Sequence, residues 1–238
     1  MKKKEVLDFQ QKRCSMRDLL IEIRQCSLFD LIADEDLFKT LNCLNVQVLN
    51  CEKGKVIFHQ GDAPKYFGVV LRGSVHVTVN HSSGIQTLIG AVDAGDLFAE
   101  TCACAEEETL PSSFVAAQDC IVMILDYMRV ITGCRNNGCL AHSLLVTNLM
   151  RSIARKNLML AQKLGVVTQR TTREKLIAYL HGQQKLAGSV RFTIPFDRQA
   201  LADYLGVDRS AMSAELSKMK KAGMIDFRKN EFEIFRLS

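Results

Sequence analysis

The stretch that decides the fold is RQALADYLGVDRSAMS, which runs from Arg198 to Ser213. Two short helices joined by a tight turn need a small residue where they touch, a glycine at the turn and apolar residues that hold the pair together. Ala202 and Gly206 meet the first two needs. The apolar positions are Leu201, Leu205, Val207 and Met212. The stretch therefore predicts a helix-turn-helix, with Asp208 placed to cap the second helix.

Polar side chains share one face of the predicted second helix. Helical spacing places them opposite the apolar Met212, Leu216 and Met219. The polar set is Arg209, Ser210, Ser213 and Ser217. Arginine can read the O6 and N7 atoms of guanine in the major groove, and serine is a short, permissive partner. A solvated face on a structural helical pair would look the same, so the prediction of DNA contact also depends on charge and on the segments nearby.

Charge is concentrated at one end of the chain. Residues 169–238 hold 13 of the 31 Lys and Arg but only 8 of the 26 Asp and Glu, so the whole net charge of +5 falls there. A basic block beside a neutral one is typical of a small domain that meets nucleic acid, although an excess of this size can also arise by chance. The residues predicted to contact DNA are Arg198, Gln199, Asp208, Arg209, Ser210, Ser213, Ser217, Lys218 and Lys229. Lys220, Lys221 and Arg228 join Lys218 and Lys229 as predicted phosphate contacts, which position a protein without specifying a sequence.

The segments around this motif complete a winged domain. Residues 224–235 predict a hairpin in which Ile225 and Phe227 mirror Phe232 and Ile234. Residues 190–194 alternate as a strand. Thr171 or Thr172 can cap a helix that ends near Gly182.

The first half of the chain changes its hydrophobic period. Residues 16–43 show helical spacing, whereas residues 46–125 form short β-rich runs with a period of two. Glycines punctuate these runs at Gly54, Gly61, Gly73, Gly84 and Gly95. Several short strands with regularly spaced glycines predict an antiparallel roll or jelly roll.

A long helix is predicted over residues 138–166. Its apolar seam has the spacing of a coiled coil and contains one polar residue, Asn157, which would set the register. The seam consists of Val146, Leu149, Ile153, Asn157, Leu160 and Leu164. The stripe can pack on the chain's own roll or on a second copy, and the self-matching seam favours the second copy.

Three stretches in chain order resemble the Crp/Fnr family of transcription regulators. Residues 51–62 (CEKGKVIFHQGD) resemble the family's early roll strands, residues 70–75 (VLRGSV) its central turn, and the residues from Val207 onwards its recognition helix. The resemblance implies a bacterial homodimer that binds a pseudo-palindromic DNA operator and works with RNA polymerase. Ser210 and Ala214 stand where the founding members use Glu and Arg, so a different operator is expected.

The expected fold class is α+β, in four segments. These are an N-terminal helical segment (1–45), an effector-sensing β-roll like a cyclic-nucleotide-binding domain (46–133), a dimerisation helix (134–166) and a winged helix-turn-helix (167–238).

Cyclic AMP is not the expected ligand of this roll. Family members that bind it carry a Gly-Glu-Leu turn and, further on, an Arg-Ser pair that grips the cyclic phosphate. The corresponding residues here are 99–101 (AET) and 111–112 (PS), and residues 106–108 (EEE) would repel an anion if they face the pocket. Losing such a charge-assisted contact costs about 2–5 kcal/mol. No cofactor is expected to be required, and the expected effector is an unidentified small molecule.

The resemblance also implies where this effector binds. The predicted pocket lies between roll and dimer helix, so that binding alters the seam and shifts the population towards a DNA-binding form. Its residues are Glu100, Thr101, Ser112, Ser113, Lys156 and Asn157.

An alternative is a redox-, metal- or haem-responsive regulator of the same family. Cys134, Cys139 and His142 could supply three zinc ligands or, with Cys102 and Cys104, a thiol switch, but buried structural thiols with a capping histidine explain them better, so no metal is expected. An iron–sulfur cluster is disfavoured by the wide spacing of Cys14, Cys26, Cys43 and Cys51. Possible haem ligands are His59, His76 and His81.

Other function classes find less support. The sequence has no His-x-His pair of the cupin type, no phosphate loop of the P-loop type and no evident catalytic triad, so it predicts no enzyme. A roll that only binds a ligand or a protein, beside an inert helix-turn-helix, stays a third possibility. No apolar run reaches 18 residues, and nine scattered Cys suit reduced thiols, so a cytoplasmic protein without membrane contact is expected.

Overall fold

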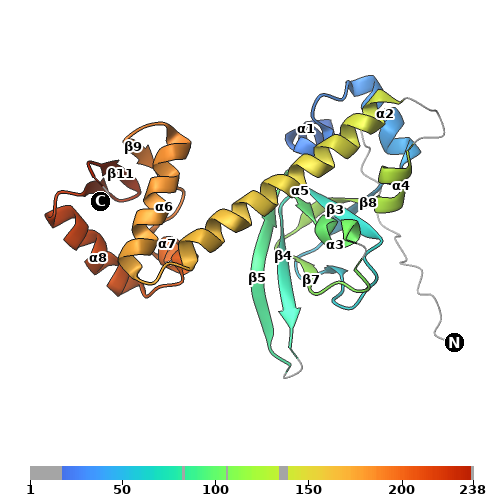
Figure 1. Cartoon of the computed structure of the whole chain (residues 1–238). Helices are drawn as coiled ribbons and strands as arrows, with labels where there is room; N and C mark the ends of the chain where they lie inside the picture. Colours follow the sequence, from blue (N-terminus) through green and yellow to red (C-terminus); the bar gives the residue numbers. More distant parts are fainter. Residues whose placement is uncertain (1–17, 82–83, 106, 134–138, 237–238) are drawn as a thin grey trace. The chain divides into compact units, whose positions relative to one another are not determined.

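The computed structural model describes residues 18–81, 84–105, 107–133 and 139–236 (Figure 1). The chain divides into two compact units, Met1–Ala154 and Arg155–Ser238. The boundary falls inside helix α5 (Leu140–Val167), so each unit contains one part of that helix. Within the described ranges, no helix is both long and apolar enough to cross a membrane.

The described part of the first unit begins with short helical pieces instead of one helix over residues 16–43. The pieces are α1 (Leu20–Gln25), the 3-10 turn η1 (Ser27–Phe29) and α2 (Asp34–Cys43). The helical region breaks first at Cys26, which is extended with a ψ of 121°, and again after Phe29, where Asp30 has a ψ of 140° and Leu31 a left-handed φ of 64°. Arg24 spans the break, because its guanidinium donates to the Phe29 carbonyl (3.2 Å) and pairs with Asp34. The predicted region is therefore helical but interrupted, and its first residues, including Cys14, lie outside the described residues.

The β-rich segment folds into two antiparallel four-stranded sheets, in the orders β1-β8-β3-β6 and β2-β7-β4-β5. The strands are β1 (Gln47–Cys51), β2 (Val56–Phe58), β3 (Tyr66–Arg72), β4 (Ser74–Asn80), β5 (Gln86–Asp93), β6 (Leu97–Phe98), β7 (Ser113–Ala116) and β8 (Cys120–Asp126). Neighbours that are distant in sequence show that the chain winds from one sheet to the other, as in a roll. The predicted antiparallel roll is confirmed (Figure 1).

Aromatic rings fill part of the space inside the roll. Phe58, Phe98 and Phe114 are buried, with ring centroids 5.4–6.1 Å apart. Gly68 makes room for this cluster, because a Cβ there would lie 2.0 Å from the Phe98 ring. The short helix α3 (Glu100–Cys104) follows β6 through Ala99, whose φ of 61° takes the left-handed value that glycine adopts more readily.

Helices α4 (Tyr127–Thr132) and the first part of α5 close the first unit. Leu145 and Leu149 of α5 are buried in one core with the N-terminal helices and the first sheet. Two polar side chains tie α5 to its neighbours. His142 Nε2 lies 2.6 Å from the Val130 carbonyl oxygen, and the Asn148 amide donates to the Leu28 (3.2 Å) and Asp30 (2.8 Å) carbonyls.

The long helix is confirmed, but its predicted seam needs one correction. Leu149 is only 2% exposed because it belongs to the roll core, whereas its neighbour Met150 is 67% exposed. With Met150 in place of Leu149, the stripe follows the strict alternation of four and three residues that a heptad repeat requires. The corrected stripe is Val146, Met150, Ile153, Asn157, Leu160 and Leu164, of which Val146 and Ile153 are half-buried and also pack against the roll core. We call these six residues the α5 stripe.

The second unit has the predicted winged architecture. Its elements after α5 are α6 (Thr172–Ala187), β9 (Arg191–Thr193), α7 (Arg198–Leu205), α8 (Arg209–Lys221), β10 (Ile225–Arg228) and β11 (Glu231–Ile234). Thr171 begins α6 with a capping box to Glu174, as predicted. The helix continues through Gly182, which is exposed and keeps the helical conformation. It ends before Gly188, because Gly188 has the left-handed φ of 62° that terminates many helices. The predicted end at Gly182 is therefore wrong.

The hairpin has the predicted register. Ile225 pairs with Ile234 and Phe227 with Phe232, and β9 adds to β11 as the third strand. The inner face of this sheet joins a core that α6, α7 and α8 complete.

Candidate nucleic-acid interface

The helix-turn-helix is built by three local devices. The Asp197 carboxylate accepts from the Ala200 amide (2.8 Å) and begins α7. Gly206 ends α7 with a left-handed φ of 61°, and the Asp208 carboxylate accepts from the Ala211 amide (2.9 Å) and begins α8. The roles predicted for Gly206 and Asp208 are confirmed.

Helix α8 has one buried face and one exposed face. Met212, Leu216 and Met219 are completely buried against the rest of the unit. Arg209, Ser210 and Ser217 are exposed and Ser213 is half-buried, so the predicted polar face is open to solvent. Two of its hydroxyls already have local partners, since Ser217 donates to the Ser213 carbonyl (2.9 Å) and Ser210 donates to the Asp208 carboxylate.

The start of α8 carries a fixed negative charge. The Ser210 hydroxyl and then the Ala211 amide hydrogen-bond to Asp208 and hold the pKa of its carboxyl below the ordinary value. The cap occupies the Ala211 amide, so a phosphate at this end has to use the other amides of the first turn. Asp208 itself therefore acts as a helix cap that sets where Arg209 lies.

An open hollow lies between the starts of α7 and α8 and the tip of the hairpin. Four residues predicted to contact DNA meet there, namely Arg198, Gln199, Arg209 and Lys229. The other lining residues are Pro195, Phe196, Asp197 and Asn230. Sequence reasoning did not select Asn230, although its place in the hairpin turn was a usable signal. Its amide donates to the Ile194 carbonyl (3.2 Å) and ties the hairpin tip to the segment before α7.

Arg198 has a second role that the sequence did not reveal. Its guanidinium carbon lies 4.8 Å from the centre of the Phe227 ring and 5.3 Å from that of Phe232. Burial in this position lowers the pKa of Arg198. The side chain thus stacks on the hairpin while it borders the hollow, and so couples α7 to the wing.

The lysines predicted to contact phosphate differ in their surroundings. Lys229 sits in the hairpin turn with a left-handed φ of 54° and is exposed. Lys218 lies 3.5 Å from Glu215 on the same helix. Lys220 is held by the sheet instead, because it pairs with Asp226 and lies 5.3 Å from the Phe227 ring centre. Of these three, Lys229 borders the hollow and has the best position for a phosphate contact.

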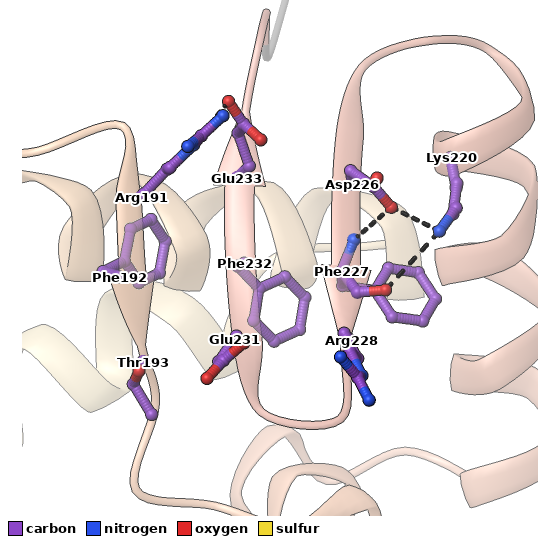
Figure 2. Close-up of a pocket in the computed structure, with 10 residues that line it drawn as sticks. All are labelled: Arg191, Phe192, Thr193, Lys220, Asp226, Phe227, Arg228, Glu231, Phe232 and Glu233. Carbon is purple, nitrogen blue, oxygen red and sulfur yellow. Dashed lines mark hydrogen bonds and ion pairs between the residues drawn. The ribbon is translucent and has the colours of Figure 1, made fainter.

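The three-stranded sheet itself bears compensating charges (Figure 2). Arg191 of β9 pairs with Glu233 of β11 (2.8 Å). Lys220 pairs with Asp226 of β10, as a dashed line in Figure 2 shows. Between these pairs the Phe192, Phe227 and Phe232 rings follow one another across the strands, with the outer two centred 6.3 and 5.7 Å from Phe232. Opposite charges balance around this sheet, whereas the hollow has an excess of positive charge, because Arg198, Arg209 and Lys229 outnumber Asp197 there.

The predicted effector residues of the roll lie around α3 and the start of β7. Glu100, Ser112 and Ser113 are buried. The Ser113 hydroxyl accepts a hydrogen bond from the backbone N–H of Gln60 (2.9 Å). Thr101 is exposed and borders a small hollow with Cys102, Ala105, Glu107, Thr109 and Pro111. Lys156 and Asn157 belong to the second unit, so their place in this pocket stays a prediction.

The predicted metal or thiol cluster is only partly described. Cys134 lies outside the described residues, and His142 uses its Nε2 at the Val130 carbonyl. In the part of the chain that the structure covers, no three His, Cys, Asp or Glu gather as metal ligands would. Burial and the nearby Glu100 raise the pKa of Cys102 and raise that of Cys104 to about 11, which disfavours reactive thiolates there.

Comparisons with known proteins agree with this architecture. Residues 48–137 match the cyclic nucleotide-binding domain family, and residues 174–238 match the Crp-like helix-turn-helix domain family. A Rhizobium leguminosarum bv. viciae protein described as a probable transcriptional activator is 26% identical over 186 residues, which cover 73% of this chain and 71% of the relative.

Two solved structures are similar to the chain. The c-di-GMP responsive global regulator CLP of Xanthomonas campestris is 15% identical with a TM-score of 0.53, and the match covers 85% of this chain and 99% of that one. The catabolite activator protein of Thermus thermophilus is 22% identical with a TM-score of 0.45, over 89% of this chain and 94% of that one. The two family matches, in this order along the chain, show a DNA-binding transcription regulator of the Crp/Fnr type, with a cyclic nucleotide-binding domain followed by a Crp-like helix-turn-helix domain.

Proposed function

We propose that the protein works as a homodimer that binds a pseudo-palindromic operator, and that a small molecule other than a cyclic nucleotide controls this binding at the roll. The observation that carries the proposal is the exposed part of the α5 stripe, where Leu160 is 66% and Leu164 60% exposed. Leucines at heptad spacing on a solvent-exposed helix favour association with a second copy, which would also present two recognition helices to two half-sites.

The hollow beside α8 supports the DNA side of the proposal. Arg209 stands in the first turn of α8 and Lys229 at the hairpin tip, so one can reach base edges while the other contacts the phosphate backbone. Contact with RNA polymerase is part of the proposal because the chain belongs to a family of transcription regulators.

The surroundings of α3 support an effector without a cyclic phosphate. Among the residues that the structure describes, those lining the hollow beside Thr101 include the acidic Glu107 and no Lys or Arg. A buried or half-buried phosphodiester needs a guanidinium or equivalent donors, and here it would meet a carboxylate instead. The side chains that line this hollow therefore suit a neutral or cationic organic molecule better than an anion. Its binding would shift the population between forms with different spacing of the recognition helices.

A binding selection from random duplexes followed by fluorescence anisotropy tests the DNA side. We expect a palindromic site, and an affinity that falls steeply with salt because bound Lys and Arg release counterions. Arg209→Ala should relax specificity at one base pair by about 1–3 kcal/mol, whereas Lys229→Ala should weaken all sites alike and lower the salt slope by about one.

Arg191→Ala is the matched control, because Arg191 pairs with Glu233 at the end of the sheet away from the hairpin tip. Its affinity and specificity should equal those of the wild type. Selection of asymmetric sites, or an affinity insensitive to salt, would contradict the proposal.

Native mass spectrometry of the purified protein tests the effector side, since a tightly bound ligand appears as added mass that a roll variant loses. We expect Thr101→Arg to abolish it, because an arginine fills the hollow. Cyclic AMP at micromolar concentration should leave operator affinity unchanged, and an increase in affinity would refute this part of the proposal.

A further inference from the structure

Two cysteines face each other across the first sheet of the roll. Cys51 is the last residue of β1 and Cys120 the first of β8, and the strand register pairs them directly. Opposed residues in an antiparallel pair have Cα atoms about 4.5 or 5.5 Å apart, and both values lie in the range of about 4.4–6.8 Å that a disulfide spans. The sheet therefore already holds two free thiols at bridging separation.

The surrounding backbone keeps Cys120 in this place. The turn between β3 and β4 packs against it, since a Cβ on Gly73 would lie 2.7 Å from the Cys120 Cβ and 2.8 Å from the Asp119 carbonyl oxygen. β1 pairs with β8 on its other side. Both cysteines are almost fully buried, at 3% and 4% exposure. Strand pairing and packing thus hold the two cysteines opposite each other inside the roll.

A hollow gives small molecules access to this pair. Cys51 and Cys120 line it together with Asn50, Glu52, Arg72, Asp119 and Ile121. Because only a small part of each thiol is exposed, the hollow favours a small oxidant over a bulky one.

The two thiols are chemically unequal. The Cys120 thiol donates a hydrogen bond to the Cys51 sulfur, and together with the Lys55 ammonium it lowers the pKa of Cys51 against the effect of burial. The same contact, burial and the nearby Asp119 raise the pKa of Cys120. Cys51 is therefore the better nucleophile, and Cys120 stays protonated beside it as the resolving thiol.

We propose that Cys51 and Cys120 form an oxidisable dithiol that reduces hydroperoxides and closes to a disulfide. The Cys51 thiolate attacks one peroxide oxygen, the O–O bond breaks, and the other oxygen leaves with a proton as water or an alcohol. Cys51 is then a sulfenic acid. The Cys120 sulfur attacks the Cys51 sulfur, the S–O bond breaks, and the hydroxide that leaves takes the Cys120 proton as water. The thiols lose two electrons, which the peroxide gains. This site goes beyond the proposed function, which assigns no role to a thiol.

Peptide mapping of the full-length protein tests this. The reduced protein is treated with hydrogen peroxide, unfolded in an alkylating reagent, digested and analysed by mass spectrometry. We expect one dominant cross-linked pair that joins the Cys51 and Cys120 peptides, and the loss of two of the nine alkylatable thiols. In Cys120→Ser, Cys51 should accumulate as a sulfenic acid that dimedone labels, and in Cys51→Ser Cys120 should stay reduced.

Cys26→Ser and Cys43→Ser are the matched controls, one for a buried thiol and one for an exposed thiol outside the pair. Both should still lose two thiols to the Cys51–Cys120 bond. A wild-type protein that keeps all its thiols, or that cross-links other cysteines first, would overturn the proposal. The wild-type map decides this even if a serine variant fails to fold.

Discussion

The two ends of α5 have the same apolar character but opposite surroundings. At the first end Leu145 and Leu149 are 0% and 2% exposed, because the N-terminal helices and the first sheet of the roll cover them. At the second end Leu160 and Leu164 are more than half exposed. Leucine spacing on a helix therefore does not tell which residues serve the chain's own core and which serve a partner. The difference indicates that Leu160 and Leu164, unlike Leu145 and Leu149, are not covered by the described residues of their own unit.

The largest effect is expected at the buried end. Leu149→Ala should destabilise the protein by about 2–5 kcal/mol, because it leaves a cavity in the roll core. Leu164→Ala should change the free energy of unfolding by no more than about 0.5 kcal/mol. Urea denaturation at a protein concentration low enough to favour the monomer measures both. If both variants lost the same free energy of unfolding, the proposed difference in burial between the two ends of α5 would be wrong.

The next effect concerns association. Leu160→Ala should weaken the proposed dimer by about 1.5–3 kcal/mol, the value of burying one leucine side chain. Sedimentation equilibrium should show a dissociation constant about 10–100 times larger. Leu186→Ala is the control, because Leu186 is equally apolar and 73% exposed but lies on α6. If both substitutions, or neither, weaken the dimer, the α5 stripe is not the interface.

Asn157 tests the register of the stripe. Asn157→Leu should strengthen association by about 1 kcal/mol, since it exchanges a polar residue in the seam for an apolar one. It should also permit higher oligomers or a shifted register, which light scattering coupled to size-exclusion chromatography detects. A weaker dimer would mean that Asn157 makes a hydrogen bond across the interface.

The smallest effect distinguishes neighbouring residues. Met150→Ala should leave the monomer's free energy of unfolding within about 0.5 kcal/mol of the wild type, in contrast to Leu149→Ala one position earlier. Its dimer should nevertheless be measurably weaker, because Met150 completes the heptad spacing. A loss of monomer stability as large as that of Leu149→Ala would move Met150 back into the core.

The helix-turn-helix could be predicted almost completely because each of its signals acts locally. Gly206 supplies the turn, Asp208 caps the next helix two residues later, and Met212 buries itself one turn further on. The hairpin register followed from alternation alone, since a shift by one residue would expose every buried side chain. The predicted helix end at Gly182 was wrong because a glycine inside an exposed helix costs only about 1 kcal/mol, which the rest of α6 can offset.

The sequence predicted which residues belong to the candidate site, but not which of them lie next to one another. Arg198 and Lys229 are 31 positions apart, and the pairing of β11 with β9 brings the hairpin tip to the segment before α7. The stacking of Arg198 on Phe227 and Phe232 depends on the same pairing. The roll residues Glu100 and Ser113 were found by resemblance, and their burial came from the structure.

The sequence by itself determined the order of roll, long helix and winged domain, since hydrophobic period, helix caps and turn glycines depend on near neighbours in the chain. Tertiary structure alone decided that Leu149 lies in the core and Met150 on the surface, and that Lys220 forms an ion pair with Asp226. It also decided that Cys51 lies opposite Cys120. Each of these outcomes depends on which distant segments come into contact, and that is set when the sheets pair and the core closes.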